Sequence, residues 1–297
     1  SNQFAGLGNI RVLLNDVNNV EHVDAVVAEA QLGGSKAEKE ETREDAITRI
    51  RRRFDILQEM TRAVIKGTVR GLILSGPPGV GKSFGVETEM EKYDMFNKLK
   101  GKGPKTEIVK GAMTPIGLYQ TLYLNSQRGD VIVFDDCDSV LFDEICLNML
   151  KAVLDSGKKR TISWKSESVA LRREGIPDRF EFQGSAIFIS NVSFESVKSK
   201  KIRDHLEALM SRCHYIDLEM DKVTDKFLRI EQIVGDGMLD EYKFGDEGNK
   251  EIVDFMLEKS ARLREISLRM VLKCADLRKM SPDTWKELAE STCMKRA

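Results

Sequence analysis

The sequence predicts an α/β fold, in which a parallel β-sheet is covered by helices on both faces and is followed by a helical domain. Short, wholly apolar segments alternate with amphipathic ones as far as residue 220, as expected for parallel strands joined by helices. No strand pattern follows residue 221, where we expect a bundle of three or four helices. The strand predictions lie at residues 72–74, 108–109, 131–134, 186–190 and 215–218.

The helix predictions come from apolar spacing and from end signals. Residues 35–38 form a capping box, and a charged stretch at 36–53 continues into an amphipathic segment that ends at Gly67. We interpret the charged stretch as a solvated helix face, with a basic contact to DNA or a partner through Arg51-Arg52-Arg53 as the alternative. Three further helices are predicted: one from residue 82 to about 92, one that starts at Thr114-Pro115, and one at about 143–155. A basic connection is predicted at 97–106, and a strand pair at 161–164 and 179–182.

Composition argues against several classes of protein. Of the 297 residues 41% are hydrophobic, which is enough for one large domain or two modest ones. A net charge of −1 gives no overall field toward DNA or anionic membranes. The five cysteines form no CxxC pair and three histidines occur, so neither a disulfide framework nor a zinc site is indicated. No apolar run is long enough to span a bilayer and no signal peptide opens the chain, so we expect a cytoplasmic protein that does not contact membranes.

A glycine-rich loop carries the strongest chemical signal. Gly76, Gly81, Lys82 and Ser83 match the pattern G-x-x-x-x-G-K-[ST], with a predicted strand before it and a predicted helix after it. Glycines let successive backbone N–H groups turn toward phosphates, and the helix adds the positive end of its dipole. Lys82 would reach the β- and γ-phosphates, and the Ser83 hydroxyl would ligate Mg²⁺. We expect the nucleotide to contact Pro78, Gly79, Val80, Gly81, Lys82, Ser83 and Phe84.

An apolar strand that ends in acidic residues supplies the second half of such a site. Residues 131–134 are followed directly by Asp135 and Asp136. We expect Asp135 to join Ser83 in holding the Mg²⁺ shell, and Asp136 to polarise the attacking water.

These two motifs and the residues after them resemble the AAA+ ATPases over about residues 54–290. The phosphate loop is similar to Walker A, and the segment 131–136 is similar to Walker B. Asn191 resembles sensor 1, the polar residue that helps to orient water beside the γ-phosphate. The resemblance implies a P-loop NTPase (AAA+) fold, an αβα domain with a C-terminal helical lid, and an ATP hydrolase that needs ATP and Mg²⁺. The implied domains are an N-terminal helical extension or linker at 1–53, the ATPase domain at 54–220 and the lid at 221–297.

Two arginines extend the resemblance. Residues 209–213 resemble the Ser-Arg-Cys motif of clamp loaders, which implies that Arg212 is an arginine finger for the ATP of a neighbouring subunit. Arg269 lies in a segment that resembles sensor 2, where a lid arginine contacts the γ-phosphate. Both would supply the cations that phosphoryl transfer needs. The alternatives are a surface arginine for Arg212, an ion pair with Glu265 for Arg269, and a strand-end turn residue for Asn191.

Asp136 departs from the family pattern, because most members have Glu at this place. Asp is one methylene shorter, so the attacking water must lie closer or a second water must bridge. This puts the hydrolysis rate in doubt rather than ATP binding. Asp138 is a weaker rival for the same role.

Two segments are candidates for contact with a partner. In AAA+ remodellers the loop after the second strand lines a central pore, and here Met113, Ile116 and Tyr119 would grip a polypeptide. The alternative is that Ile116, Tyr119 and Tyr123 are core positions of a helix. The strand pair within 160–184 carries aromatic residues and Arg172-Arg173, and would either insert toward DNA or protein, or extend a sheet with its aromatics packed inside.

The resemblance implies self-association into a ring or open ring, most commonly a hexamer, because an arginine finger requires a neighbour. Our leading hypothesis is an oligomeric ATPase that remodels a protein or protein–nucleic-acid partner. The alternatives are a replication factor, either a clamp loader or a helicase loader, and an ATP-binding switch with slow turnover. The compact organisation and the run 180–191 resemble bacteriophage AAA+ proteins, which implies expression in the host cytoplasm.

Overall fold

A parallel β-sheet forms the centre of the protein. The computed structural model describes residues 41–165, 168–192, 194, 197–220 and 222–296. The five strands lie in the order β2-β3-β6-β1-β7, and every neighbouring pair is parallel. The predicted strands are therefore confirmed. Their bounds are Gly71–Ser75 (β1), Thr106–Lys110 (β2), Val131–Asp135 (β3), Ser185–Ser190 (β6) and His214–Asp217 (β7).

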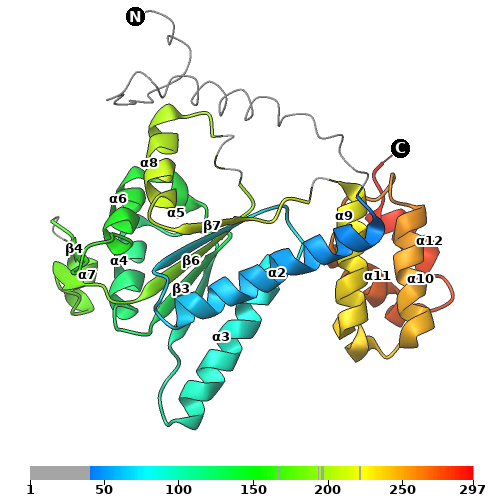
Figure 1. Ribbon diagram of the computed structural model, residues 1–297, viewed down its shortest axis with the longest axis horizontal. Coiled ribbons are helices and arrows are strands. Elements are labelled where there is room, and N and C mark those ends of the chain that lie inside the picture. Colours follow the sequence, from blue (N-terminus) through cyan, green and yellow to red (C-terminus); the bar gives the residue numbers. More distant parts are fainter. Residues whose placement is uncertain (1–40, 166–167, 193, 195–196, 221, 297) are drawn as a thin grey trace, which may run out of the picture. The chain divides into compact units, whose positions relative to one another are not determined.

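Helices cover both faces of this sheet, as Figure 1 shows. Alternate residues of a strand point to opposite faces, so Ile73 packs in one cluster while Leu72 and Leu74 pack in the other. The buried strands β1, β3 and β6 are apolar almost throughout because both faces are covered. One face carries α4 (Pro115–Leu124), α5 (Ser139–Phe142), α6 (Glu144–Val153) and α8 (Lys200–Met210), and the other carries α2 (Arg43–Ile65) and α3 (Lys82–Leu99).

Helix α2 runs through the domain boundary that we expected at residue 53. Its buried residues Ala46, Ile50 and Phe54 recur at helical spacing in one cluster with strand residues, and the compact unit begins at Ala46. The helix ends before Gly67, which has a φ of 73°, so the predicted end is confirmed. The predicted capping box at 35–38 lies outside the described residues.

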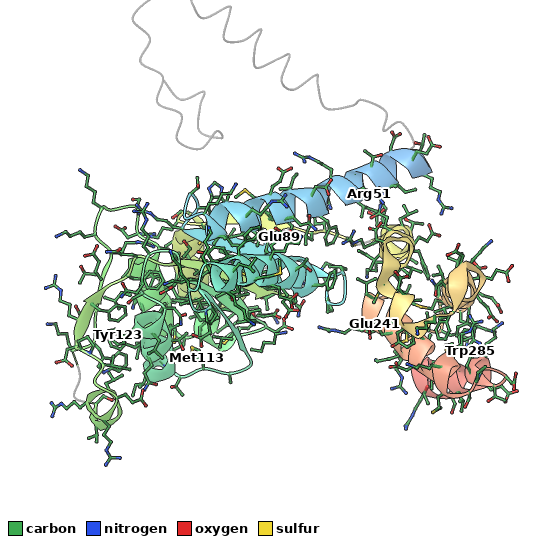
Figure 2. The ribbon with its side chains drawn as sticks, turned by 90° about the horizontal axis from the view of Figure 1, so that it is seen from below. Arg51, Glu89, Met113, Tyr123, Glu241 and Trp285 are labelled. Carbon is green, nitrogen blue, oxygen red and sulfur yellow. The ribbon has the colours of Figure 1, made fainter. Side chains whose placement is uncertain are left out.

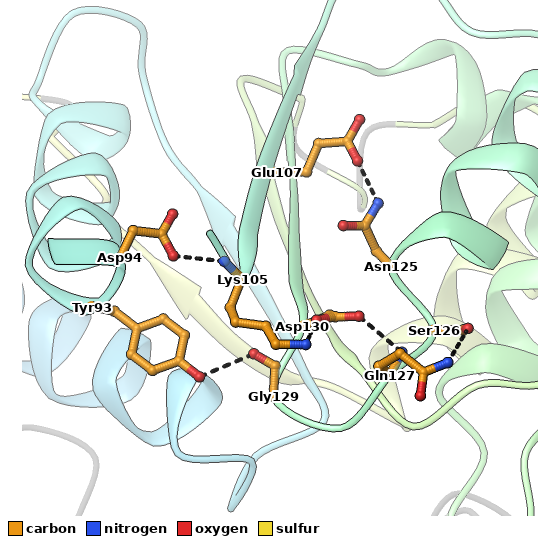
Figure 3. A network of polar contacts seen from close by, with 9 residues as sticks. All are labelled: Tyr93, Asp94, Lys105, Glu107, Asn125, Ser126, Gln127, Gly129 and Asp130. Atoms are coloured by element: carbon orange, nitrogen blue, oxygen red, sulfur yellow. Dashed lines mark hydrogen bonds and ion pairs between the residues drawn. The ribbon is translucent and has the colours of Figure 1, made fainter. Parts of the chain in front are cut away.

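Helix α3 is longer than its predicted end near residue 92, because its last turns are tied to the edge of the sheet. Figure 3 shows the contacts. The Asp94 carboxylate accepts from the Lys105 backbone N–H at 2.7 Å, and the Tyr93 hydroxyl donates to the Gly129 carbonyl at 3.2 Å. Lys105 Nζ in turn lies 2.6 Å from Asp130 Oδ1. The predicted connection at 97–106 was therefore wrong at its start, and the link is confined to residues 100–105.

Three helices on the α4 side had not been predicted. Two are short, α5 and α7 (Val169–Arg173), and give no periodic pattern. The third, α8, begins after the Ser199 N-cap and buries only Leu206 and Leu209 among many charged residues. The predicted strand pair is confirmed as an antiparallel hairpin of β4 (Thr161–Ser163) and β5 (Arg179–Glu181).

The C-terminal region folds around a core of its own, as expected for a lid. Trp285, which is labelled in Figure 2, meets Phe255 edge to face with ring centroids 4.9 Å apart. Helix α9 continues into a π-helical turn at Val234–Met238 and a 3₁₀ turn at Asp240–Tyr242. The helices are α9 (Val223–Ile233), α10 (Gly245–Glu258), α11 (Leu268–Met280) and α12 (Trp285–Cys293).

The predicted fold class is confirmed by the parallel sheet, by the glycine-rich loop between β1 and α3, and by the C-terminal helical lid. It is an αβα fold with a phosphate-loop motif after the first strand and a helical domain at its C-terminal end. Within the described residues no helix combines the length and the apolar character needed to cross a bilayer.

Candidate functional site

The phosphate loop connects β1 to α3 through three glycines in conformations that L side chains rarely adopt. The φ values are 149° at Gly76, 74° at Gly79 and 96° at Gly81. Gly81 is the N-cap of α3 and no side chain caps it, so the first N–H groups of the helix keep their capacity for an acceptor. Such a helix end favours an anion such as a phosphate.

Lys82 is buried at the start of α3, with 5% of its surface exposed. Its Nζ donates to the carbonyls of Gly76 (2.8 Å) and Pro77 (2.9 Å) and to Asn191 Oδ1 (2.8 Å). Burial lowers the pKa of Lys82 to about 8, against the opposing charges of Asp136 and Asp135. The amine therefore stands close to its titration point at neutral pH.

Asn191 links the lysine to an acid. Its Nδ2 donates to Asp136 Oδ1 at 2.7 Å, while its Oδ1 accepts from Lys82. Asp136 has a φ of 51°, a left-handed conformation that costs a non-glycine residue about 1–3 kcal/mol. Its backbone N–H donates to the Ile189 carbonyl at 3.0 Å, which holds the turn against β6.

Ser83 and Asp135 form the second polar pair. Ser83 Oγ donates to Asp135 Oδ1 at 2.9 Å, and Lys110 Nζ lies 3.4 Å from Asp135 Oδ2. A hydroxyl and a carboxylate are oxygen ligands of the kind that Mg²⁺ prefers, and Mg²⁺ commonly keeps waters and needs one or two protein ligands. This pair therefore fits the ion, although among the described residues no three His, Cys, Asp or Glu side chains are grouped so that they could hold a metal ion.

The lid contacts the phosphate loop directly. The Leu268 backbone N–H, at the start of α11, donates to the Gly79 carbonyl at 2.8 Å. Ser267 caps α11 by accepting from the Met270 N–H at 3.2 Å, and its side chain fills the space where a Cβ of Gly79 would lie. The next residue, Arg269, borders the same cavity as Lys82.

A cavity of about 530 Å³ lies between the phosphate loop and the lid, a size typical of small-molecule sites. Lys82, Ser83, Asp136, Asn191 and Arg269, all predicted from the sequence, border it together. Glu265, the alternative partner of Arg269, instead lies 3.5 Å from Lys273. Sequence reasoning missed the lid side of the cavity, which is lined by Ile233, Asp236, Gly237, Met238, Glu241, Leu268 and Leu272.

Other predicted residues take different places. Phe84 borders the cavity with 67% of its surface exposed, whereas Val80 is buried in the core. Asp135 accepts a hydrogen bond from Ser83 but does not itself border the cavity. Asp138 accepts from Ser190 Oγ at 2.7 Å and does not border the cavity, so the geometry favours Asp136 over its rival.

A protein of Enterobacteria phage T4 decides the family. It is the uncharacterised 36.7 kDa protein of the nrdC-mobD intergenic region, and it is 34% identical over 260 residues, which are 86% of this chain and 78% of the phage protein. The chain belongs to the family of this phage protein. The interpretation as a bacteriophage-type protein agrees with this relative, and no protein-family profile matches the chain.

Two solved structures resemble this chain more distantly, and both are 13% identical to it in sequence. One is NtrX from Brucella abortus in complex with ATP, with a TM-score of 0.47 over 94% of this chain and 59% of NtrX. The other is PCH-2 of C. elegans, with a TM-score of 0.38 over 80% of this chain and 65% of PCH-2. The chain thus spans less than two thirds of each of these two longer proteins.

Arg212 of this chain lies at the opposite end of the strands from the phosphate loop. It lies two residues before the start of β7, whereas the phosphate loop follows the far end of the parallel neighbour β1. Its Nη1 donates to the Ala208 carbonyl at 2.6 Å, and it borders a separate polar cavity with Arg70 and His214. Arg212 therefore does not join the other predicted residues within one chain.

The predicted partner segments are mostly core. Tyr119 is fully buried, donates to the Pro177 carbonyl at 2.8 Å and meets Phe180 edge to face, so the pore-grip hypothesis is wrong for this residue. Met113, labelled with Tyr123 in Figure 2, and Ile116 are half-buried against the same cluster. The hairpin packs its aromatics, because Trp164 contacts Tyr119 and Phe182 is buried.

The charged stretch of α2 is largely ion-paired. Arg52 lies 3.0 Å from Glu59 and Arg51 lies 3.7 Å from Asp236, while Arg53 donates to the Glu219 carbonyl. These contacts favour the interpretation as a solvated helix face.

Replacing Gly79 by Ala should separate the lid from the phosphate loop. A Cβ there would lie 2.6 Å from Ser267 Cβ, at a φ that is itself strained. We expect a loss of stability of about 1–2 kcal/mol from the backbone and, in addition, faster hydrogen exchange of the Leu268 amide. Gly67→Ala is the matched control, because Gly67 has a φ of 73° and open space around it. Equal exchange at Leu268 in both variants would contradict the lid contact.

Proposed function

We propose that this chain is an ATP hydrolase of the AAA+ type. The observation that carries the proposal is the continuous polar chain Lys82–Asn191–Asp136, which borders the lid cavity together with Ser83, the hydrogen-bond partner of Asp135. It places a cation, an amide and two carboxylates next to a loop whose helix N-terminus favours phosphates. This is the set of groups that phosphoryl transfer to water requires.

Each residue has a distinct part in this proposal. Lys82 exchanges its carbonyl partners for β- and γ-phosphate oxygens and neutralises their charge. Asp136 accepts a hydrogen bond from the attacking water, and Asn191 holds both that carboxylate and the lysine in line. Arg269 adds positive charge from the lid beside the γ-phosphate. Ser83 and Asp135 would hold Mg²⁺, which supplies charge neutralisation between the β- and γ-phosphates.

The lid side of the cavity suits the base of the nucleotide. Ile233, Met238, Leu268 and Leu272 are apolar residues that line the same cavity as the polar chain. A purine ring would be covered there while the phosphates face the loop, and closure of the lid would exclude water from the reacting end.

We further propose that the active form is an oligomer, a ring or open ring and most commonly a hexamer. The placement of Arg212 supports this, because an arginine at the opposite end of the strands can complete a site only in another copy of the chain. Nucleotide held between subunits would link assembly to ATP binding.

We propose that ATP hydrolysis drives the remodelling of a protein or protein–nucleic-acid partner. The Ser211-Arg212-Cys213 segment favours a second candidate, a clamp loader or helicase loader; stimulation of turnover by primed DNA with a sliding clamp would support it. The short Asp136 side chain favours a third, an ATP-binding switch whose turnover is slow.

Phosphate release measured with Lys82→Ala tests the proposal. We expect turnover to fall by at least about 100-fold, since a cation that stabilises the transferring phosphoryl group is removed. Lys92→Ala is the matched control on the same helix, because Lys92 is an exposed lysine paired with Glu89 at 2.9 Å. Turnover that persists in Lys82→Ala would remove the phosphate-loop assignment.

Mixing inactive variants tests action between subunits. Asp136→Ala destroys the water-positioning site of its own chain, and Arg212→Ala destroys the finger offered to another chain. A mixture in which both assemble should recover part of the wild-type turnover, because some interfaces then combine an intact site with an intact finger. Arg128→Ala, at an exposed arginine in a loop, serves as the control variant. Assembly without recovery would show that Arg212 does not serve a neighbour.

Nucleotide affinity should depend on pH through Lys82. The free lysine has a pKa of about 8, and bound phosphate would raise it. Below pH 8 the amine is charged in both states, whereas above it binding must take up a proton. Affinity for ATP should therefore fall as the pH rises above about 8, by at most about tenfold per unit. Titration calorimetry in buffers of different ionisation enthalpy would measure the uptake, and Lys82→Arg should abolish it because arginine stays protonated.

A further inference from the structure

A second lid arginine lies against the phosphate loop. Arg229, on α9, has 8% of its surface exposed, and its guanidinium lies over the ring of Phe54 from α2, 3.4 Å from the ring centroid. An added Cβ on Gly81 would lie 3.9 Å from Arg229 Nη2. Ile233, one turn later on α9, borders the nucleotide cavity, as does Gly81 itself. Arg229 thus stands where α2, the lid and the loop meet.

The guanidinium of Arg229 uses little of its hydrogen-bonding capacity within the described residues. Its Nε has no hydrogen-bond partner among the described residues, and Nη1 makes one long contact of 3.4 Å to Gln232 Oε1. Within the same residues no carboxylate lies at ion-pair distance from it. The acidic groups Asp236 and Asp55 face the guanidinium from further away. The basic group Arg51 also faces it and is paired with Asp236.

Such a group is costly to keep without an anionic partner. Burial lowers the pKa of Arg229 to about 10, so the side chain remains a cation at neutral pH. A buried charge that lacks a partner destabilises a fold, and the cation–π contact with Phe54 offsets only part of this cost. An unpartnered donor beside a phosphate-binding loop indicates an anion that arrives there.

We propose that Arg229 is a nucleotide-binding residue whose acceptor is a phosphate oxygen of the bound nucleotide. The inference rests on the proposed function, since it needs a nucleotide on the loop. It adds a lid cation from α9 to Arg269 from α11. Because the same guanidinium covers Phe54, phosphate binding then fixes α2, the lid and the loop against one another.

Arg160 offers a matched control. It is also a buried arginine, with 9% exposed, its pKa is also lowered to about 10 by burial, and it lies over the ring of Phe182 at 5.3 Å. Unlike Arg229 it donates to a backbone carbonyl, that of Val153, at 2.9 Å. It belongs to the hairpin, whereas Arg229 Nη2 lies 3.9 Å from the Cβ position of Gly81 in the phosphate loop.

The experiment measures the affinity of full-length protein for Mg²⁺-ADP, AMP and adenosine by titration calorimetry, and the melting temperature without nucleotide. Arg229→Met should weaken ADP binding by about 10- to 100-fold, the range for a lost hydrogen bond to a charged group. The same substitution should change the affinity for adenosine little, because adenosine has no phosphate. The nucleotide-free melting temperature should stay level or rise, because an apolar side chain of similar length replaces an unpaired charge. Arg160→Met should leave all three affinities unchanged and lower the melting temperature.

The outcomes separate this proposal from the one on which it rests. If the wild-type protein binds none of the three ligands, the proposed function falls and this inference falls with it. If wild type binds ADP and Arg229→Met binds it equally well, Arg229 is a packing residue and the inference alone is overturned. A loss that is the same for adenosine and ADP would assign the contact to the base or ribose and would also overturn it. Arg229→Lys, which keeps the charge, should bind ADP with intermediate affinity and replaces the methionine variant if that does not fold.

Discussion

The parallel pairing of β1, β6 and β3 is the constraint on which the candidate site depends. In register, Ser75 pairs with Ser190, and Ile189 pairs with Asp135. The residues that follow these strand ends therefore emerge at one edge, within hydrogen-bond reach of one another. A shift of one residue in β6 would turn its side chains to the opposite faces and move Asn191 away from both Lys82 and Asp136. The geometry of the site is thus set by backbone hydrogen bonds in an apolar sheet rather than by the polar groups themselves.

This dependence explains why much of the site could be predicted from the sequence. Asp136 and Asn191 directly follow strands that are recognisable as apolar runs, and Lys82 ends the glycine-rich loop that follows a third. Parallel strands bring their carboxyl ends to one edge. Lys82, Asp136 and Asn191 were therefore placed together without coordinates. The lid side of the cavity gave no comparable signal, because Ile233, Leu268 and Leu272 have the spacing of ordinary core residues in a helix. Whether such residues face a core or a cavity depends on how two domains pack, and that information is not local.

The same limit accounts for the differences in the fold. Helix α3 continues past its expected end because Asp94 and Tyr93 bond to residues that are distant in sequence, and α8 buries too few apolar residues to show a pattern. Tyr119 was a candidate for gripping a substrate because of its place after the second strand. Its spacing also fitted a helix core, and the aromatic cluster with Trp164 and Phe180 decides for the core. Position within a family pattern was a weaker guide here than apolar spacing.

The bonding of Asn191 has a consequence for turnover. Its Oδ1 accepts from Lys82 and its Nδ2 donates to Asp136, so in the proposed hydrolase the cation that would bind phosphate and the carboxylate that would position water share one amide. When Lys82 turns to phosphate oxygens, Asn191 Oδ1 loses that donor and can accept from the attacking water, while Nδ2 still orients Asp136. Binding of the phosphate by Lys82 would then be coupled to orientation of the attacking water by Asn191. The short reach of Asp136 fits this arrangement, because its turn is held in a left-handed conformation by the bond to Ile189 and the carboxylate cannot advance on its own. A chain built in this way would hydrolyse ATP at a rate set by how completely the phosphate draws Lys82 from Asn191.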